Sequence, residues 1–110
     1  SNISLMSLSL EILNSRIAVV TKAGKYCLGI KETLNNLRAG HGLIVLIPSN
    51  CPTLRMIEIE FMAHLADTPV EVYPGSTREL GTACGMLFIA CCMCITNAGD
   101  AVLSVLTQYF

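Results

Sequence analysis

The chain lacks tryptophan and carries few aromatic or charged residues. Its 110 residues are 5% aromatic and 14% charged, well below the roughly 25% charge usual in soluble globular proteins. An apolar fraction of 53% excludes disorder as the dominant state. The longest apolar run, Met86 to Thr96, has 11 residues, and a transmembrane helix needs about 18 or more. We therefore expect a single small globular domain, residues 1–110, in which this run forms a buried strand.

Motifs of common enzyme classes are also missing. The sequence contains no G-x-S-x-G, no P-loop and no G-x-G-x-x-G. The two histidines, His41 and His64, are not at ligand spacing from any cysteine pair. We expect no catalytic residue, no metal, no cofactor and no small-molecule substrate, so the chain is predicted not to be an enzyme.

The chain has six cysteines, at positions 27, 51, 84, 91, 92 and 94. Cys91 and Cys94 form a C-x-x-C pair, which in redox and zinc motifs lies on a turn or at a helix start. Here the pair falls inside the predicted strand, where positions i and i+3 face opposite sides. We interpret these cysteines as small buried hydrophobes. Because no signal-peptide pattern is seen, reduced thiols and a cytoplasmic location are expected, and a thiol redox protein stays a third alternative.

Charge is distributed unevenly along the chain. The net charge is −1, but residues 1–40 carry five cations against two acidic groups, whereas residues 41–110 carry two against six. A basic N-terminal part favours contact with phosphates. The overall balance does not suggest a non-specific nucleic-acid binder.

Helical and strand patterns alternate. Ser76 and Glu79 form a capping box at the start of one helix, and Pro52 suits the first position of another. Helices are predicted at about 8–21, 30–39, 52–66, 76–85 and 101–107, and strands at 26–28, 43–47, 70–73 and 87–96. The last three strands are predicted to be buried. Such alternation predicts a mostly parallel or mixed sheet covered by helices on both faces.

Three stretches carry a more specific pattern. They are G-K-Y-x-L-G-x-K at 24–31, N-x-P-x-L-R at 50–55 and E-L-G-T-A-x-G at 79–85. In this order and spacing, over residues 8–105, the chain resembles the eukaryotic and archaeal family of large-subunit ribosomal protein thirty, within the kink-turn RNA-binding superfamily. The resemblance implies an α/β fold, a three-layer α/β/α sandwich with a mixed four-stranded sheet.

The resemblance also implies that a kinked internal loop of RNA docks at one end of the sandwich. Gly29 at a helix start allows close approach of an anion, Asn50 offers a donor and an acceptor to a base edge, and Phe88 can stack on an unpaired base. The predicted RNA-binding residues are Lys25, Gly29, Lys31, Glu32, Asn50, Arg55, Gly85 and Phe88. Six of them are expected to gather on one edge: Gly29, Lys31, Glu32, Asn50, Arg55 and Phe88.

Each of these residues also has a purely structural explanation. Phe88 could be a core residue of a strand, Arg55 a solvated helix residue, Gly29 only a turn, and Lys25 plain surface. The functional prediction is a structural constituent of the large (60S) subunit in the cytoplasm, with ribosomal RNA and neighbouring ribosomal proteins as partners and no membrane. The alternative is a diverged non-ribosomal relative that acts as a protein-interaction module.

Departures from the family lie mainly in charge. At several positions the family commonly has lysine or another polar residue, and this chain has a different one. These positions are Asn35, His41, Met56, Ile57, Asp67, Met86 and Ile89. Fewer cations weaken phosphate attraction and its salt dependence. Two explanations stay open: reduced RNA contacts in its ribosome, or relaxed constraint on a diverged relative. We predict that at least two of the four apolar replacements are exposed in the isolated chain, where a partner would cover them.

Overall fold

The computed structural model describes residues 2–99, and the side chains from residue 9 onward. The helices are α1 (Asn2–Ala23), α2 (Ile30–Arg38), α3 (Thr53–Leu65) and α4 (Thr77–Ala83), and the strands are β1 (Lys25–Leu28), β2 (Ile44–Pro48), β3 (Val70–Tyr73) and β4 (Met93–Asn97). The helix predicted at 101–107 lies outside the described residues. Elements up to β3 fall where the sequence predicts them, with α1 extended toward the N-terminus.

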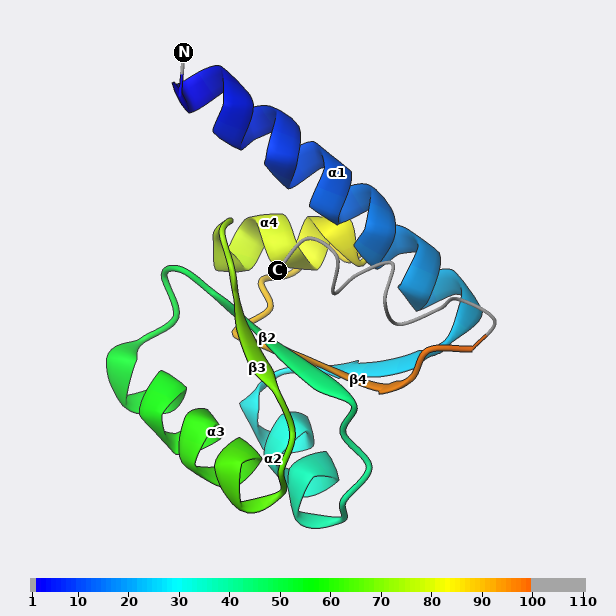
Figure 1. The fold of residues 1–110 in the computed structure, drawn as a ribbon, viewed down its shortest axis with the longest axis vertical. Helices are drawn as coiled ribbons and strands as arrows, with labels where there is room; N and C mark the ends of the chain where they lie inside the picture. Colours follow the sequence, from blue (N-terminus) through cyan, green and yellow to red (C-terminus); the bar gives the residue numbers. More distant parts are fainter. Residues whose placement is uncertain (1, 100–110) are drawn as a thin grey trace.

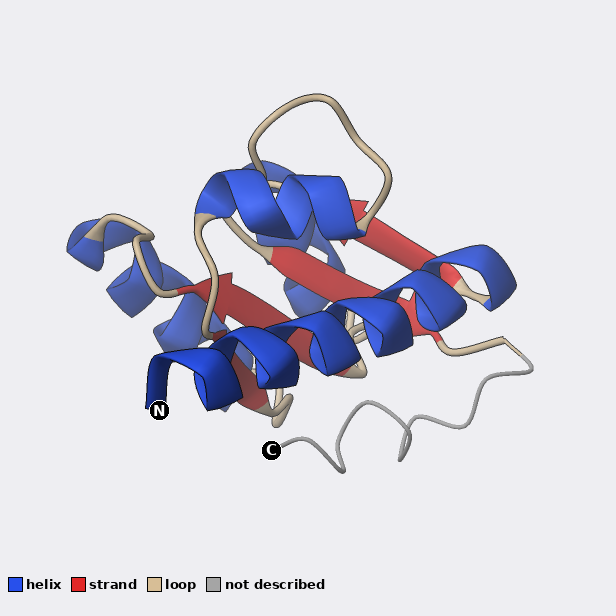
Figure 2. Cartoon of the chain, turned by 90° about the horizontal axis from the view of Figure 1, so that it is seen from above, coloured by secondary structure: helices blue, strands red, loops and turns tan. Residues whose placement is uncertain are grey.

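The predicted mixed sheet and three layers are confirmed. The strand order is β1-β4-β2-β3, with β2 and β3 parallel and the other pairs antiparallel. Helices α1 and α4 cover one face of the sheet, and α2 and α3 cover the other (Figure 1). Seen from above, α1 and α4 lie over the strands (Figure 2). In the described part of the chain, no helix is long and apolar enough to cross a membrane.

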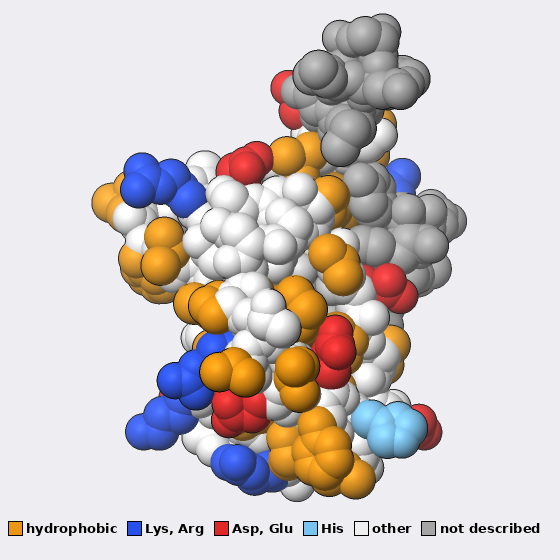
Figure 3. Space-filling model, turned by 90° about the vertical axis from the view of Figure 1, so that its left-hand side faces the viewer, with side chains coloured by type: hydrophobic (Ala, Val, Ile, Leu, Met, Phe, Trp, Pro, Cys, Tyr) orange, Lys and Arg blue, Asp and Glu red, His pale blue; other side chains and the backbone are white. Residues whose placement is uncertain are grey.

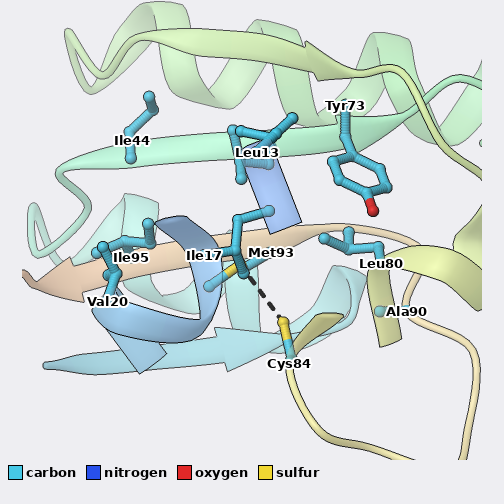
Figure 4. Packing of buried hydrophobic residues seen from close by; sticks show 11 residues of the cluster. Leu13, Ile17, Val20, Ile44, Tyr73, Leu80, Cys84, Ala90, Met93 and Ile95 are labelled. Carbon is cyan, nitrogen blue, oxygen red and sulfur yellow. Dashed lines mark hydrogen bonds between the residues drawn. The ribbon is translucent and has the colours of Figure 1, made fainter. Parts of the chain in front are cut away.

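Two hydrophobic clusters hold the layers together. Between α1, α4 and the sheet, Leu13, Ile17 and Val20 of α1 pack on Ile44, Met93 and Ile95 of the strands (Figure 4). On the other face, α2 and α3 contribute the buried side chains of Leu34, Leu37, Ile59 and Ala63. The four-residue spacing from Leu13 to Ile17, and from Ile59 to Ala63, places each pair on one helix face.

The fourth strand is shorter than predicted. The run from Met86 to Thr96 is not one buried strand, because β4 begins only at Met93 and residues 86–92 form a loop. Main-chain bonds from Met86 N–H to Gly81 O (2.9 Å) and from Ala90 N–H to Thr77 O (3.0 Å) hold this loop on α4 instead of the sheet. The C-x-x-C pair is therefore not inside one strand: Cys91 precedes β4 and is half-buried, whereas Cys94 is within it and buried.

The third strand differs from the prediction in its burial. β2 is buried along its whole length, as expected for a strand with neighbours on both sides. β3 is an edge strand, and the side chain of Val72 is 53% exposed. The sequence of β3, V-E-V-Y, includes the charged Glu71, and only Tyr73 is buried, which fits a strand with a neighbour on one side only.

Candidate nucleic-acid interface

One end of the sheet collects most of the predicted residues. In the β1–β4 pair, Leu28 lies opposite Met93, and β2 runs antiparallel to β4, so Pro48 at the end of β2 lies toward the same end. The β1–α2 turn, the β2–α3 loop and the loop of residues 84–92 therefore leave the sheet together. We call the surface that these three segments form the loop end.

Gly29 shapes the first of these segments. It stands between β1 and α2 with φ 101° and ψ 160°, a backbone region that only glycine adopts without strain. Its N–H donates to Cys92 O (3.0 Å), and its carbonyl accepts from Thr33 N–H (3.1 Å). The turn is thus fixed to the start of β4, and the exposed side chains of Lys31 and Glu32 follow on the first turn of α2.

Asn50 is held in a defined orientation on the second segment. Its Oδ1 accepts a hydrogen bond of 2.8 Å from the main-chain N–H of Thr77, the first residue of α4. Because the carbonyl side of the amide is used in this way, the Nδ2 donors remain for a ligand. Asn50 is exposed, so these donors are at the surface.

Arg55 and Lys31 line a groove between α2 and α3. The groove has a volume of about 380 Å³ and also includes Arg38 and Glu58 in its wall. Arg55 Nη1 lies 3.3 Å from Glu58 Oε2, with both side chains largely exposed. Such an exposed pair is weak, on the order of 0–1 kcal/mol, so Arg55 can exchange its carboxylate for an anionic ligand.

Phe88 projects from the third segment. Its side chain is 60% exposed, between Leu87 and Ile89, which are also exposed. The core explanation of Phe88 is therefore wrong, and the aromatic ring is available for stacking. Gly85 is exposed as well, and its φ of +78° turns the chain from α4 into this loop.

Lys25 does not join the others. It is exposed at the first position of β1, opposite Asn97 at the far end of β4. The length of β1 separates Lys25 from Gly29, so Lys25 lies apart from the six residues expected on one edge. Of the other seven, Gly29, Asn50, Gly85 and Phe88 lie on the three segments of the loop end. Lys31, Glu32 and Arg55 lie on the first turns of α2 and α3, which follow two of those segments.

Two residues that shape the loop end, and one that lines the neighbouring groove, were not among the predicted ones. A Cβ on Gly81 would collide with the carbonyl oxygen of Phe88, so glycine lets the loop approach α4. Thr77 anchors Asn50 and, through its carbonyl, Ala90. Arg38, in the last turn of α2, also lines the groove, about two turns beyond Lys31. Gly81 had a signal in the sequence as the first glycine of the E-L-G-T-A-x-G stretch, and Arg38 stands in L-R-A-G at 37–40, which belongs to the same pattern.

Apolar side chains are exposed beside these polar ones. Ile57 and Ile89 are each 56% exposed, whereas Met56 and Met86 are partly buried against the two cores. The prediction that at least two of these four are exposed is confirmed. Figure 3 views the molecule from the side toward which β2 ends, and shows cationic side chains along one margin with hydrophobic side chains beside them.

Sequence comparison finds a family and several relatives. The model of the ribosomal protein L7Ae/L30e/S12e/Gadd45 family matches residues 11–104. The chain is 50% identical over 93 residues to the large ribosomal subunit protein eL30 of Spodoptera frugiperda, covering 84% of this chain and 82% of that protein. It is 48% identical over 91 residues to eL30 of Euphorbia esula, covering 83% of this chain and 81% of the relative.

Comparison of structures finds the same fold in more distant proteins. The Giardia lamblia 15.5kD RNA binding protein superimposes with a TM-score of 0.74 at 23% identity, over 94% of this chain and 84% of its own. A protein of unknown function from Bacillus halodurans C gives a TM-score of 0.73 at 13% identity, over 88% of this chain and 91% of its own. At these identities the likeness concerns the fold.

Proposed function

Because the chain belongs to the ribosomal protein L7Ae/L30e/S12e/Gadd45 family, we propose that it is a structural, non-enzymatic protein of the large ribosomal subunit that binds ribosomal RNA. Its relatives at about half identity bear the name large ribosomal subunit protein eL30. The cytoplasmic ribosome is then its site of action. The finer proposal is that the RNA is a kinked internal loop, and that the loop end is the surface that binds it.

The loop end carries this proposal, because it combines three kinds of contact that irregular RNA requires. The exposed ring of Phe88 offers a stacking surface to an unpaired base. The Nδ2 donors of Asn50 suit a base edge, since the Oδ1 is already bonded to Thr77. Lys31 and Arg55 in the groove between α2 and α3 suit phosphates.

The shape of the β1–α2 turn adds a fourth contact. Gly29 has no side chain to keep RNA away, and a Cβ there would meet nothing within 4 Å. RNA backbone can therefore approach the main chain of the turn and the first turn of α2 closely. Glu32, exposed on that turn, can accept a hydrogen bond from a base amino group.

Neighbouring ribosomal proteins are proposed as a second class of partner. The outer side of α3 exposes Leu54 (82%), Phe61 (63%) and Leu65 (65%) in addition to Ile57. Apolar groups exposed together on a helix mark an interaction surface. This same observation favours the alternative function, a protein-interaction module without an RNA ligand.

Binding to two matched RNAs tests the proposal and separates it from the alternative. One RNA carries a kink-turn internal loop, and the other has the same flanking helices with the loop replaced by Watson–Crick pairs. We expect the chain to bind the first at least tenfold more tightly in fluorescence anisotropy. Equal affinity for both, or no binding to either while circular dichroism shows the folded protein, would overturn the kink-turn proposal.

A further inference from the structure

Three cysteines from distant parts of the chain meet under α2. Cys27 lies on β1, Cys92 immediately precedes β4, and Cys94 lies within β4. All three belong to the cluster between the sheet and α2, in which Cys92 and Cys94 are buried and Cys27 is partly buried. The proposed RNA contacts use none of them.

Cys27 and Cys94 are direct neighbours across two strands. The register of the antiparallel β1–β4 pair places them opposite each other, and both pack in the same cluster, so their side chains leave the same face of the sheet. Opposite residues of an antiparallel pair have Cα atoms roughly 4.5–5.5 Å apart. A disulfide accepts Cα separations of about 4.4–6.8 Å and needs Cβ atoms about 3.5–4.5 Å apart. Opposite residues have Cβ atoms roughly 4.5–5.5 Å apart, so a small local approach of the edge strand β1 to β4 allows the bridge.

The surroundings of Cys27 favour its thiolate. Asn36 Nδ2 donates to Cys27 Sγ at 3.2 Å, and Thr33 Oγ1 lies 3.9 Å from the same sulfur. Hydrogen bonds from Cys94, Thr33 and Asn36 lower the pKa of Cys27 to about 6, against the opposing effect of burial. Burial, by contrast, raises the pKa of Cys84 to about 11 and that of Cys92 to about 12.

Cys27 is also the accessible member of the pair. β1 is an edge strand, so one side of it is not covered by another strand of the sheet (Figure 1), and Cys27 is only partly buried. Cys27 is thus the more exposed thiol of the pair, since Cys94 is fully buried. The two thiols therefore suit different roles: Cys27 can react first with a small oxidant, and Cys94 can resolve the product.

We propose that Cys27 and Cys94 form a modification site for peroxides, in which Cys27 is oxidised and Cys94 then closes a cross-strand disulfide. The Cys27 thiolate attacks one peroxide oxygen, the O–O bond breaks, and hydroxide leaves, which gives a sulfenic acid. The Cys94 sulfur attacks the Cys27 sulfur, a new S–S bond forms, and the Cys27 oxygen leaves as water with the Cys94 proton. In sum, two thiols and one hydrogen peroxide give one disulfide and two waters, and a dithiol reverses the change.

The sequence offers a direct way to map the bond. Met93 separates Cys92 from Cys94, so cyanogen bromide cleavage places these two cysteines on different fragments. Lys31 and Arg38 lie between Cys27 and Cys51, so trypsin separates those two. Together the two cleavages distinguish a Cys27–Cys94 bridge from a bridge to Cys51, to Cys84 or to the fragment that holds Cys91 and Cys92, and tandem mass spectrometry separates the last two.

The experiment treats the reduced, folded full chain with stoichiometric hydrogen peroxide, alkylates the remaining thiols, and maps the product by mass spectrometry without reduction. We expect loss of two of the six thiols, a mass lower by two hydrogen atoms, and a Cys27–Cys94 linkage that dithiothreitol removes. A bridge to Cys92, or oxidation that begins at another cysteine, would overturn the proposal. The proposal would also be overturned if the folded chain kept all its thiols after exposure to peroxide.

Two variants separate the roles of the two thiols. In Cys94→Ala, oxidation should stop at the sulfenic acid of Cys27, which dimedone traps. The same variant lacks the Cys94 hydrogen bond to Cys27, so the alkylation rate of Cys27 should reach half its maximum at a higher pH than in the unaltered chain. Cys84→Ala is the matched control, because Cys84 is buried against Met93 on the other side of the sheet. It should form the same bridge; an equal loss of bridging in both variants would contradict the assignment of Cys94.

Discussion

The β1–α2 turn and the loop of residues 84–92 form two halves of the loop end by opposite means. The turn presents main chain and charge: Gly29 leaves the backbone bare, and Lys31 and Glu32 follow on α2. The loop presents apolar surface, with Leu87, Phe88 and Ile89 all exposed. One half therefore suits the phosphate backbone and the other suits unstacked bases.

The two halves are nevertheless joined by the main chain. Gly29 N–H donates to Cys92 O at the end of the loop, and Ala90 N–H donates to Thr77 O at the start of α4. The polar half thus has a fixed position relative to the apolar half. Under the proposed function, the difference means that stacking and shape on one half supplement the few cations of the other.

The largest expected effect concerns the apolar half. Phe88→Ala should weaken binding of a kink-turn RNA by about 1–3 kcal/mol, the range for one base–aromatic stack. The measurement is fluorescence anisotropy, with urea unfolding of the same variant. Phe88 is exposed, so the free energy of unfolding should change little.

A second substitution distinguishes stacking from general apolar contact. Phe88→Leu keeps an apolar side chain and should still lose most of the affinity. If Phe88→Leu binds like the unaltered chain, or if affinity in Phe88→Ala follows only the folded fraction, the ring does not stack.

The polar half is tested at Gly29. Gly29→Ala should destabilise the fold by roughly 1–3 kcal/mol, because the backbone there lies in a region that alanine adopts only under strain. It should also weaken RNA binding, since the methyl group lies where RNA approaches. Urea unfolding and anisotropy measure the two effects separately.

Gly40→Ala is the matched control for this substitution. Gly40 also has a positive φ (74°) with nothing within 4 Å of an added Cβ, but it follows the C-terminal end of α2, away from the loop end. It should lower stability and leave the RNA affinity of the folded protein unchanged. Equal effects of both variants on binding would show that Gly29 is only a turn.

The two polar groups of Asn50 can be tested separately: Oδ1 accepts from Thr77 N–H, and the Nδ2 donors are proposed to bind RNA. Asn50→Ala removes the acceptor for Thr77 N–H and should cost about 0.5–1.5 kcal/mol of stability, as one hydrogen bond does. Asn50→Asp keeps that acceptor and removes the Nδ2 donors, so stability should be retained and RNA binding lost. An aspartate variant that binds as well as the parent would contradict base recognition by Asn50.

The smallest effect is expected from charge. With three cations in the groove wall, Lys31, Arg38 and Arg55, the log–log slope of affinity against salt should be near 3 or below, at about 0.7–0.9 for each phosphate neutralised. Lys31→Gln should lower this slope by less than about 1. A slope above about 6 would mean that the contact surface extends far beyond the loop end.

Much of the fold could be predicted, because the spacing of apolar residues in the sequence matches the helix and strand faces that are buried between the layers. The capping box at Ser76 and Glu79 forms as expected, and β2, a continuous apolar run, is buried throughout. The apolar run at 86–96 misleads for a physical reason: exposed apolar residues and buried ones look alike in sequence. Main-chain bonds to Gly81 and Thr77 hold this loop on α4, and Gly81 has no side chain to push Phe88 away; no periodicity reports either feature.

The candidate site was less accessible to sequence reasoning than the fold. The stretches around Gly29, Asn50 and Gly85 indicate the right segments, but not the bond between Asn50 and Thr77, which lie far apart in the chain. Lys25 was included because it stands in the same stretch as Gly29, and the length of β1 separates the two. Likewise, the C-x-x-C spacing drew attention to Cys91, whereas the register of β1 and β4 pairs Cys94 with Cys27.

The close contact between α4 and the loop of residues 84–92 has a consequence for how this surface can change over time. The loop owes its course to main-chain bonds and to the missing side chain at Gly81, so its exposed residues are not needed to hold it in place. Mutation can therefore replace Leu87 or Ile89 while the loop keeps its place on α4. Different loop sequences could likewise be inserted between Gly85 and Ala90. Ligand preference at this loop can thus evolve separately from folding.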